Sequence, residues 1–336
     1  MTKVIGIDIG YGQTKVAWQE NGAIRKASFP SLVGAYVEAA TGGIISDSDA
    51  AVVKIPVGDD LYIVGDEVSH QQKTPLNYRG KDWINSIAYK VLCKYAIVSN
   101  RLADRYSDVL IVTGLPVNYV KTDTAAVEDI IRGAVAEYFG NMYVWVVPQP
   151  YGSFCHLMFN DNAFLRDPNI PKELIGVLDI GYYTSDFITI KNMRVVESKM
   201  DSYEHGVSTI LAQLRKDYMH KYQITSISPS LVEQTVLTRQ LKIHGEVNDV
   251  SNIVNQRLQN FAKEILGHAK NIWGDAHAYD RLIISGGGAA LVENFLADHM
   301  RLTVCDDARF ANALGYLKYG VRLASTVDQK TAACPK

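Results

Sequence analysis

The chain has 336 residues, a length that suits two domains better than one. Hydrophobic residues make up 47% of the chain and charged residues 21%, the composition of an ordinary soluble globular protein. The formal net charge of −2 offers no electrostatic basis for direct binding to nucleic acid.

Other features of the whole chain exclude membrane-spanning, secreted and zinc-binding proteins. No apolar run approaches the roughly 18 residues of a membrane-spanning helix, and no signal peptide precedes the first strand, so we predict a cytoplasmic protein with no membrane contact. The histidines do not cluster, and the cysteines have neither CxxC nor metal-ligand spacing, so we expect reduced thiols and no zinc site. The cysteines are Cys93, Cys155, Cys305 and Cys334.

The first predicted element is an apolar strand that ends at Asp8, followed by a glycine turn and a second apolar stretch. Glycines in the turn let a ligand approach its backbone N–H groups, and Lys15 adds a positive charge that suits a phosphate. A carboxylate at the strand end suits Mg²⁺, directly or through water. An ordinary hairpin would show the same pattern. The candidate nucleotide-binding residues are Asp8, Gly10, Tyr11, Gly12, Gln13, Thr14 and Lys15.

A polar region from about residue 34 to 79 follows, with short strand-like pieces at residues 51–55 and 61–64. We predict that it is a small subdomain inserted in the first domain, although a mobile surface insertion is equally consistent with its composition. Alternating helical and strand patterns come next, and together they predict an α/β fold. The predicted elements are a helix over 81–100, a strand over 109–114, a helix over 122–139 and a strand over 143–147.

The strand–turn–strand pattern occurs a second time, and Asp-Ile-Gly-Tyr is found both at Asp8–Tyr11 and at Asp179–Tyr182. This repetition favours a metal-binding role for Asp8 and Asp179 over a purely structural one. The second copy has Asp186 where the first has Lys15, so we assign Asp186 a supporting role. The candidate nucleotide-binding residues of the second copy are Gly181, Tyr182, Tyr183 and Thr184.

The remaining elements include a third candidate binding segment. Gly206 opens a predicted helix and could allow close approach of a nucleotide, although it is equally consistent with a plain helix start. Residues 222–250 are predicted to form an insertion, and residues 251–273 a long amphipathic helix. A strand over 281–285 leads into Gly286, Gly287 and Gly288, where backbone can press against a ring or a phosphate. A final helix is expected over 309–323, with frayed residues after about 324.

The order of these three segments resembles that of the actin-like ATPase superfamily, which includes actin, the seventy-kilodalton heat-shock chaperones and the hexokinase-type sugar kinases. The segments Gly6–Gly12 and Phe310–Tyr316 are similar to the ParM/StbA-type plasmid-segregation actins and their archaeal relatives. The resemblance implies an actin-like, ribonuclease H-like fold with a nucleotide in the interdomain cleft. It also implies one domain over 1–150, a second over 151–317, and a C-terminal helix, about 318–336, that returns to the first.

The resemblance assigns further roles. Gln149 matches the residue that orients the attacking water in the superfamily, although it could simply be a turn residue between two prolines. Asp179 is the candidate that holds magnesium-bound water near the terminal phosphate. The implied function is a filament-forming ATPase, with Mg²⁺ and ATP or GTP, that segregates plasmid or other DNA through self-assembly and a DNA-binding adaptor protein.

Three alternatives remain. A small-molecule kinase of the same fold needs a base for its substrate hydroxyl, and Gln149 is not one. A chaperone-like ATPase would carry a long C-terminal substrate domain, which we do not expect here. A nucleotide-binding scaffold without useful hydrolysis is also consistent with the motifs.

Overall fold

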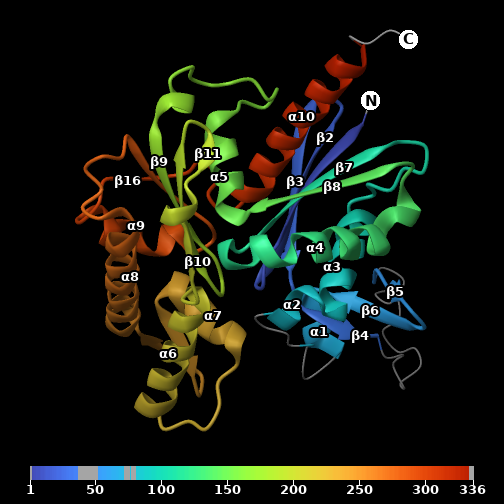
Figure 1. Ribbon diagram of the computed structural model, residues 1–336. Coiled ribbons are helices and arrows are strands. Elements are labelled where there is room, and N and C mark those ends of the chain that lie inside the picture. Colours follow the sequence, from blue (N-terminus) through green and yellow to red (C-terminus); the bar gives the residue numbers. More distant parts are fainter. Residues whose placement is uncertain (1, 37–51, 72–75, 77–80, 333–336) are drawn as a thin grey trace. The chain divides into compact units, whose positions relative to one another are not determined.

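The computed structural model describes residues 2–36, 52–71, 76 and 81–332, and the chain divides into two compact units (Figure 1). Unit 1 comprises Met1–Pro168 and Phe310–Lys336, and unit 2 comprises Asn169–Arg309. Both boundaries differ from the predicted ones near residues 150 and 317. The reason is that helix α5 (Gln149–Met158) and helix α10 (Ala311–Ala332) pack against each other within unit 1.

Unit 1 is built on a five-stranded sheet in the order β3-β2-β1-β7-β8. The first three strands form antiparallel pairs, and β7 and β8 run parallel to β1. The β2–β3 turn has positive φ at Asn21 (51°) and Gly22 (78°), which is the conformation that a two-residue hairpin turn favours. The strands are β1 (Lys3–Ile9), β2 (Gln13–Glu20), β3 (Ala23–Pro30), β7 (Val109–Leu115) and β8 (Met142–Pro148).

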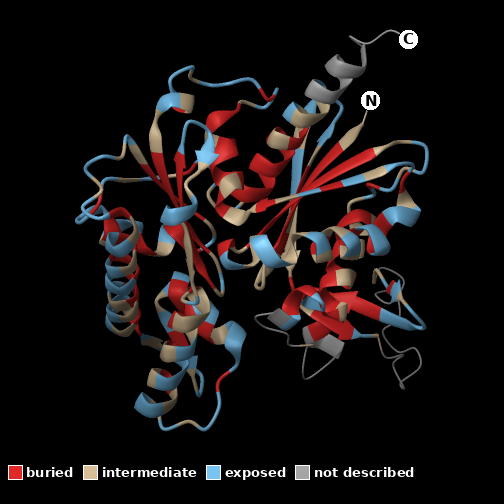
Figure 2. Ribbon diagram, in the orientation of Figure 1, coloured by how far each residue is buried: buried red, intermediate tan, exposed pale blue. Residues whose placement is uncertain are grey.

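Both faces of this sheet are covered, which explains why β7 is buried along its whole length (Figure 2). Because side chains alternate along a strand, Ile5 and Ile7 join the core formed with α3 (Ile87–Ser99) and α4 (Val120–Val135). Val4 joins the opposite core, formed with α10.

The predicted helix over 81–100 is interrupted. The structure has α2 (Lys81–Ile84), a break, and then α3. Ser86 causes the break, since its Oγ accepts a hydrogen bond from the Tyr89 N–H (3.1 Å) and donates to the Trp83 carbonyl (2.6 Å). The chain changes direction at this N-cap. Trp83 before it and Tyr89 after it both join the core that includes Ile5 and Ile7.

The predicted insertion over 34–79 is described only in part, because residues 37–51, 72–75 and 77–80 lie outside the described residues. Its described part forms a three-stranded sheet, in the order β4-β6-β5, with one short helix. These elements are β4 (Val33–Ala35), β5 (Ile55–Val57), β6 (Asp60–Val64) and α1 (Asp66–Gln71).

Unit 2 repeats the sheet of unit 1, with the order β11-β10-β9-β15-β16 and β12 paired to β10. Its first hairpin is antiparallel, and β15 and β16 run parallel to β9. The two units therefore share the order and direction of their main strands, so the repeat extends well beyond the four residues Asp-Ile-Gly-Tyr. The strands are β9 (Leu174–Ile180), β10 (Ser185–Lys191), β11 (Arg194–Val195), β12 (Asp201–Tyr203), β15 (Arg281–Ser285) and β16 (Leu302–Val304).

Four helices form one core with this second sheet: α6 (Val207–Lys221), α7 (Pro229–Thr238), α8 (Ser251–Trp273) and α9 (Ala289–Ala297). The structure confirms the predicted limits of α8. Between α6 and α8, in the segment predicted as an insertion, lie α7 (Pro229–Thr238), β13 (Gln240–Ile243) and β14 (Glu246–Asp249). Ser228 caps α7 by accepting a hydrogen bond from the Leu231 N–H.

Helix α10 is longer than predicted. It continues through Ala332, whereas the sequence predicted frayed residues after about 324. It lies against α5 at a contact between two glycines. A Cβ added at Gly315 would be 1.7 Å from the Gly152 carbonyl oxygen, so only glycine allows this approach. No helix in the described part of the chain is long and apolar enough to cross a lipid bilayer.

Candidate functional site

The first turn, residues 10–14, is closed by its own backbone and supported by Ser31. The Gly10 N–H donates to the Gln13 carbonyl (3.2 Å). The Ser31 N–H donates to the Gly12 carbonyl (3.0 Å), and its hydroxyl donates to the Gly10 carbonyl (2.6 Å). These bonds engage the carbonyls of the turn and so hold its N–H groups in a fixed arrangement, the arrangement that suits an anion. The Thr14 side chain is fully buried beside Ser31 (3.0 Å), so Thr14 supports the turn from within.

Asp8 lies directly before this turn, and its side chain joins two other predicted site residues. Its Oδ2 accepts from Lys15 Nζ (2.9 Å), and its Oδ1 accepts from Gln149 Nε2 (2.7 Å). Asp8 is only 1% exposed, and the pairing of β1 with β2 places it opposite Lys15. Sequence positions separated by 141 residues therefore meet at one carboxylate, which carries a charge-assisted hydrogen bond on each oxygen.

Helix α10 holds Gln149 in place from the other side. The Tyr316 hydroxyl donates to the Gln149 carbonyl (3.0 Å), and the Tyr316 side chain is completely buried. One turn away, Asn312 Oδ1 accepts from both the N–H (3.2 Å) and the hydroxyl (2.6 Å) of Ser153. The start of α5, and with it the Gln149 side chain, is thus fixed by hydrogen bonds to helix residues that lie 159 and 167 positions later in the chain.

The second turn, residues 181–184, closes in the same way as the first. The Gly181 N–H donates to the Thr184 carbonyl (2.9 Å), which is the equivalent of the bond from Gly10 to Gln13. Asp179 is 4% exposed and lies opposite Asp186 in the β9–β10 pairing, as Asp8 lies opposite Lys15. Asp186 accepts a 2.6 Å hydrogen bond from the Thr184 hydroxyl. This bond agrees with the supporting role predicted for Asp186.

The other predicted residues of unit 2 surround this second turn. Gly206 precedes α6, whose first N–H groups donate to the turn: Val207 to the Gly181 carbonyl (3.1 Å) and Ser208 to the Tyr182 carbonyl (2.7 Å). A Cβ at Gly206 would be 2.6 Å from the Tyr182 carbonyl oxygen. Close packing against the turn therefore accounts for a glycine at this position without a nucleotide.

The three consecutive glycines after β15, Gly286 to Gly288, differ in how closely other atoms surround them. Gly286 has a φ of 87°, and a Cβ there would be 2.3 Å from Asp179 Oδ1. Gly288 donates its N–H to the Ile180 carbonyl (2.9 Å), and a Cβ there would be 2.4 Å from Ile180 Cγ2. At Gly287 a Cβ would meet nothing within 4 Å. Two of the three glycines are thus required by packing against β9, and the middle one is not.

We expect Gly286→Ala to lower the free energy of unfolding of unit 2 by about 2–3 kcal/mol, because the methyl group adds both a strained φ and an overlap with Asp179. Gly287→Ala is the matched control and should change it by less than about 1 kcal/mol. Urea denaturation followed by circular dichroism measures both. Equal effects of the two substitutions would contradict the assigned packing.

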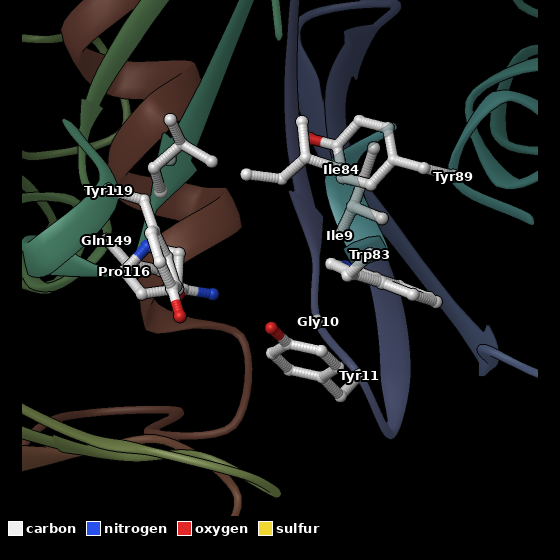
Figure 3. A pocket seen from close by; sticks show the side chains of 11 residues that line it. Ile9, Gly10, Tyr11, Trp83, Ile84, Tyr89, Pro116, Tyr119 and Gln149 are labelled. Carbon is white, nitrogen blue, oxygen red and sulfur yellow. The ribbon is translucent and has the colours of Figure 1, made fainter. Parts of the chain in front are cut away.

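A pocket of about 310 Å³, including its solvent-open part, adjoins the first turn within unit 1 (Figure 3). The Tyr11 ring stacks on Trp83 at one wall, with ring centroids 5.1 Å apart. Burial raises the pKa of the Tyr89 phenol well above its usual value, so this group stays neutral. The lining residues, mostly apolar or aromatic, are Ile9, Gly10, Tyr11, Trp83, Ile84, Tyr89, Gly114, Leu115, Pro116, Tyr119 and Gln149.

The donors present fit a magnesium ion that is held together with a triphosphate. Among the described residues there is no group of three or more histidine, cysteine or carboxylate side chains that could hold a metal by itself. Each turn instead offers one buried carboxylate, Asp8 or Asp179. Mg²⁺ usually keeps several waters and takes one or two carboxylates, with phosphates supplying the other ligands, so one buried carboxylate beside such a turn suits it.

Sequence patterns assigned no role to three residues that support the site. Ser31 bonds a carbonyl of the first turn and belongs to no recognisable motif. Tyr316 bonds the Gln149 carbonyl and lies in the segment Phe310–Tyr316, which indicated a family but no role for this residue. Ser285 lies beside Asp179, with its Oγ 3.5 Å from Asp179 Oδ1. Only its position at the end of the strand that precedes the glycine run could have suggested it.

Two family models match the chain, one in each unit. Residues 6–152 match the actin like proteins N terminal domain, and residues 177–298 match the C-terminal domain of the archaeal actin homologue, MreB-like. An archaeal actin homolog of Thermoplasma volcanium is 24% identical over 336 residues, covering 93% of this chain and 97% of that protein. The corresponding protein of Thermoplasma acidophilum is also 24% identical, with the same coverage.

Solved structures agree with these matches. The native structure of Ta0583, an archaeal actin homolog, has a TM-score of 0.77 at 20% identity, covering 96% of this chain and 100% of the other. A 15-stranded ParM filament from Clostridium botulinum has a TM-score of 0.76 at 23% identity, covering 96% and 99%. These likenesses confirm the predicted α/β, actin-like fold. With both of its units matched by models of actin-like proteins, the chain belongs to the actin-like superfamily.

Proposed function

We propose that this protein is a nucleotide-dependent ATPase that assembles into filaments and segregates plasmid or other DNA. It binds ATP or GTP with Mg²⁺ through the first and second turns, and hydrolysis promotes disassembly. It works in the cytoplasm and reaches DNA through an adaptor protein, since its net charge of −2 does not favour direct contact.

The observation that carries this proposal is the geometric repeat of the two turns. Each is closed by a glycine N–H that donates to the carbonyl three residues later, and each follows a buried aspartate. A repeated turn with fixed N–H groups is suited to phosphate oxygens. The likeness to a ParM filament supports self-assembly. Head-to-tail contacts between identical subunits produce open filaments.

The residues have separate tasks in this proposal. Backbone N–H groups of the two turns and Lys15 hold phosphate oxygens, while Asp8 and Asp179 hold waters of the magnesium ion. Magnesium, when bound with the nucleotide, neutralises charge on the phosphate oxygens. The Gln149 amide orients the attacking water without taking its proton, because an amide is not a base at neutral pH.

Right-angle light scattering of the purified protein tests the proposal. Adding Mg-ATP or Mg-GTP should raise the scattering, which should decay as phosphate is released, and negative-stain images should show filaments. Mg-ADP is the control and should give no lasting rise. No rise with any nucleotide over a wide protein concentration range would overturn the filament proposal.

We expect Gln149→Ala to slow phosphate release by about tenfold to a hundredfold while filaments still assemble and persist longer, because positioning of the water is lost but phosphate contacts are kept. The measurement is a coupled phosphate assay run alongside scattering. Gln256→Ala, on the exposed face of α8, is the matched control. Unchanged phosphate release in Gln149→Ala would assign Gln149 a structural role only.

A further inference from the structure

The segment between β12 and α6, residues 203–206, holds the second turn through backbone contacts. Ser185, which directly follows the turn, is completely buried, and its hydroxyl donates to the His205 carbonyl (2.6 Å). The first two N–H groups of α6, directly after this segment, donate to two carbonyls of the turn. Any contact that fixes the His205 backbone therefore also fixes the second turn.

The His205 side chain has three such contacts within unit 2. Its Nε2 lies 2.5 Å from Glu264 Oε2 on α8. Its ring stacks on Tyr203, with centroids 4.9 Å apart, and on Phe261, with centroids 5.1 Å apart and an interplanar angle of 11°. Only 14% of the His205 side chain is exposed. Since Glu264 and Phe261 both belong to α8, the imidazole ties residues 203–206 to a helix of the unit 2 core.

A second pair of imidazole and carboxylate continues the stack of rings. The His268 ring is nearly parallel to the Tyr203 ring, with centroids 4.6 Å apart and an interplanar angle of 5°. His268 Nε2 lies 3.0 Å from Asp201 Oδ2. Tyr203 thus contacts two imidazoles, and each imidazole has its own carboxylate. A proton taken up by either ring is therefore balanced by a negative charge beside it.

Protonation changes the strength of the bond between His205 and Glu264. Histidine is the side chain whose charge ordinarily changes between about pH 5 and pH 8. A neutral imidazole can donate to a carboxylate, but a charged one forms a charge-assisted bond that is roughly twice as strong. The Glu264 side chain is 47% exposed, so solvent screens the pair and the gain is moderate. Glu204 faces the turn instead, where its Oε2 accepts from the Tyr183 hydroxyl (3.4 Å).

We propose that His205 is a positioning residue for the second turn, and that its bond to Glu264 makes nucleotide binding tighter at pH 6 than at pH 8. The protonated imidazole holds residues 203–206 more firmly against α8, and these residues hold the turn. This role rests on the proposed function, in which the second turn binds phosphate oxygens. His205 acts through the backbone that follows it, and not through a contact with phosphate.

Calorimetric titration of the full chain with Mg-ADP, which is not hydrolysed, tests this role at pH 6 and pH 8. His205→Gln should weaken binding about threefold to tenfold more at pH 6 than at pH 8, because glutamine lacks the ring at both pH values but lacks a charge only at pH 6. Glu264→Gln keeps both rings and an acceptor, and should weaken binding at pH 6 only. His220→Gln, at an exposed position in α6, is the matched control and should match the unmodified protein at both pH values.

Hydrogen exchange without nucleotide separates this role from the proposed function. The Val207 and Ser208 N–H groups should lose about threefold or more additional protection in His205→Gln at pH 6, compared with pH 8. An equal loss of Mg-ADP affinity at both pH values, or none, would overturn the proposal, because a purely structural role does not depend on protonation. Absence of nucleotide binding by the unmodified protein would overturn the proposed function, and the exchange rates would still decide whether His205 positions the turn.

Discussion

Asp8→Asn is expected to lower nucleotide turnover by about a hundredfold to a thousandfold, the cost of removing one electrostatic contributor from a phosphoryl-transfer site. The asparagine side chain has nearly the same shape but no charge. It cannot form an ion pair with Lys15 Nζ, and its amide offers one oxygen where the carboxylate offers two to Lys15 and Gln149. One substitution therefore disturbs Lys15, Gln149 and Asp8 itself, which we propose as the phosphate contact, the water-positioning residue and the metal contact.

A coupled phosphate-release assay at saturating Mg-ATP measures this effect. Asp129→Asn is the matched control, because Asp129 is exposed and forms a surface ion pair with Arg132 on α4. It should keep full turnover. If Asp8→Asn, folded by circular dichroism, keeps turnover within about threefold of the unmodified protein, then Asp8 serves the hairpin alone and the catalytic proposal for it fails.

Gly315→Ala is expected to lower the free energy of unfolding of unit 1 by more than about 3 kcal/mol, or to prevent its folding. The added methyl group would lie 1.7 Å from the Gly152 carbonyl oxygen and 2.9 Å from the His156 backbone nitrogen. Both are main-chain atoms of α5, so no side chain can rotate away to make room. Helices α5 and α10 must move apart, and the Tyr316 bond to Gln149 would be lost with that movement.

The matched control is the same change in a helix with free space around it. At Gly133 in α4 a Cβ would meet nothing within 4 Å, so Gly133→Ala should raise stability by up to about 1 kcal/mol through helix propensity. Thermal unfolding should show the two variants shifted in opposite directions, by about 2–4 °C for each kcal/mol. A Gly315→Ala protein as stable as the unmodified one would show that α5 and α10 do not pack this closely in solution.

Local patterns predicted most of the fold. Apolar strands ending in Asp-Ile-Gly-Tyr predicted both turns, since strand periodicity and glycine act over a few neighbouring residues. The periodic stripe of α8 predicted that helix to the residue. The interruption before α3 was missed because a single serine cap can divide a continuous apolar stripe.

The site was harder to predict than the fold, because its geometry depends on contacts between distant parts of the chain. Gln149 was selected through the order of motifs, but its bond to Asp8 depends on how β8 leads into α5. The contributions of Ser31 and Tyr316 depend on tertiary hydrogen bonds to carbonyls. Every residue has a backbone carbonyl, so no sequence pattern marks which of them will be used.

The two parts of unit 1, Met1–Pro168 and Phe310–Lys336, also determine the order in which a growing polypeptide can fold. As the ribosome extends the chain, β1 emerges first, yet the face that carries Val4 and Leu110 gains its cover only when α10 has been made. Unit 2 is contiguous and emerges complete before that. Its sheet can therefore close first, while the nascent unit 1 still exposes apolar surface of the kind that chaperones bind.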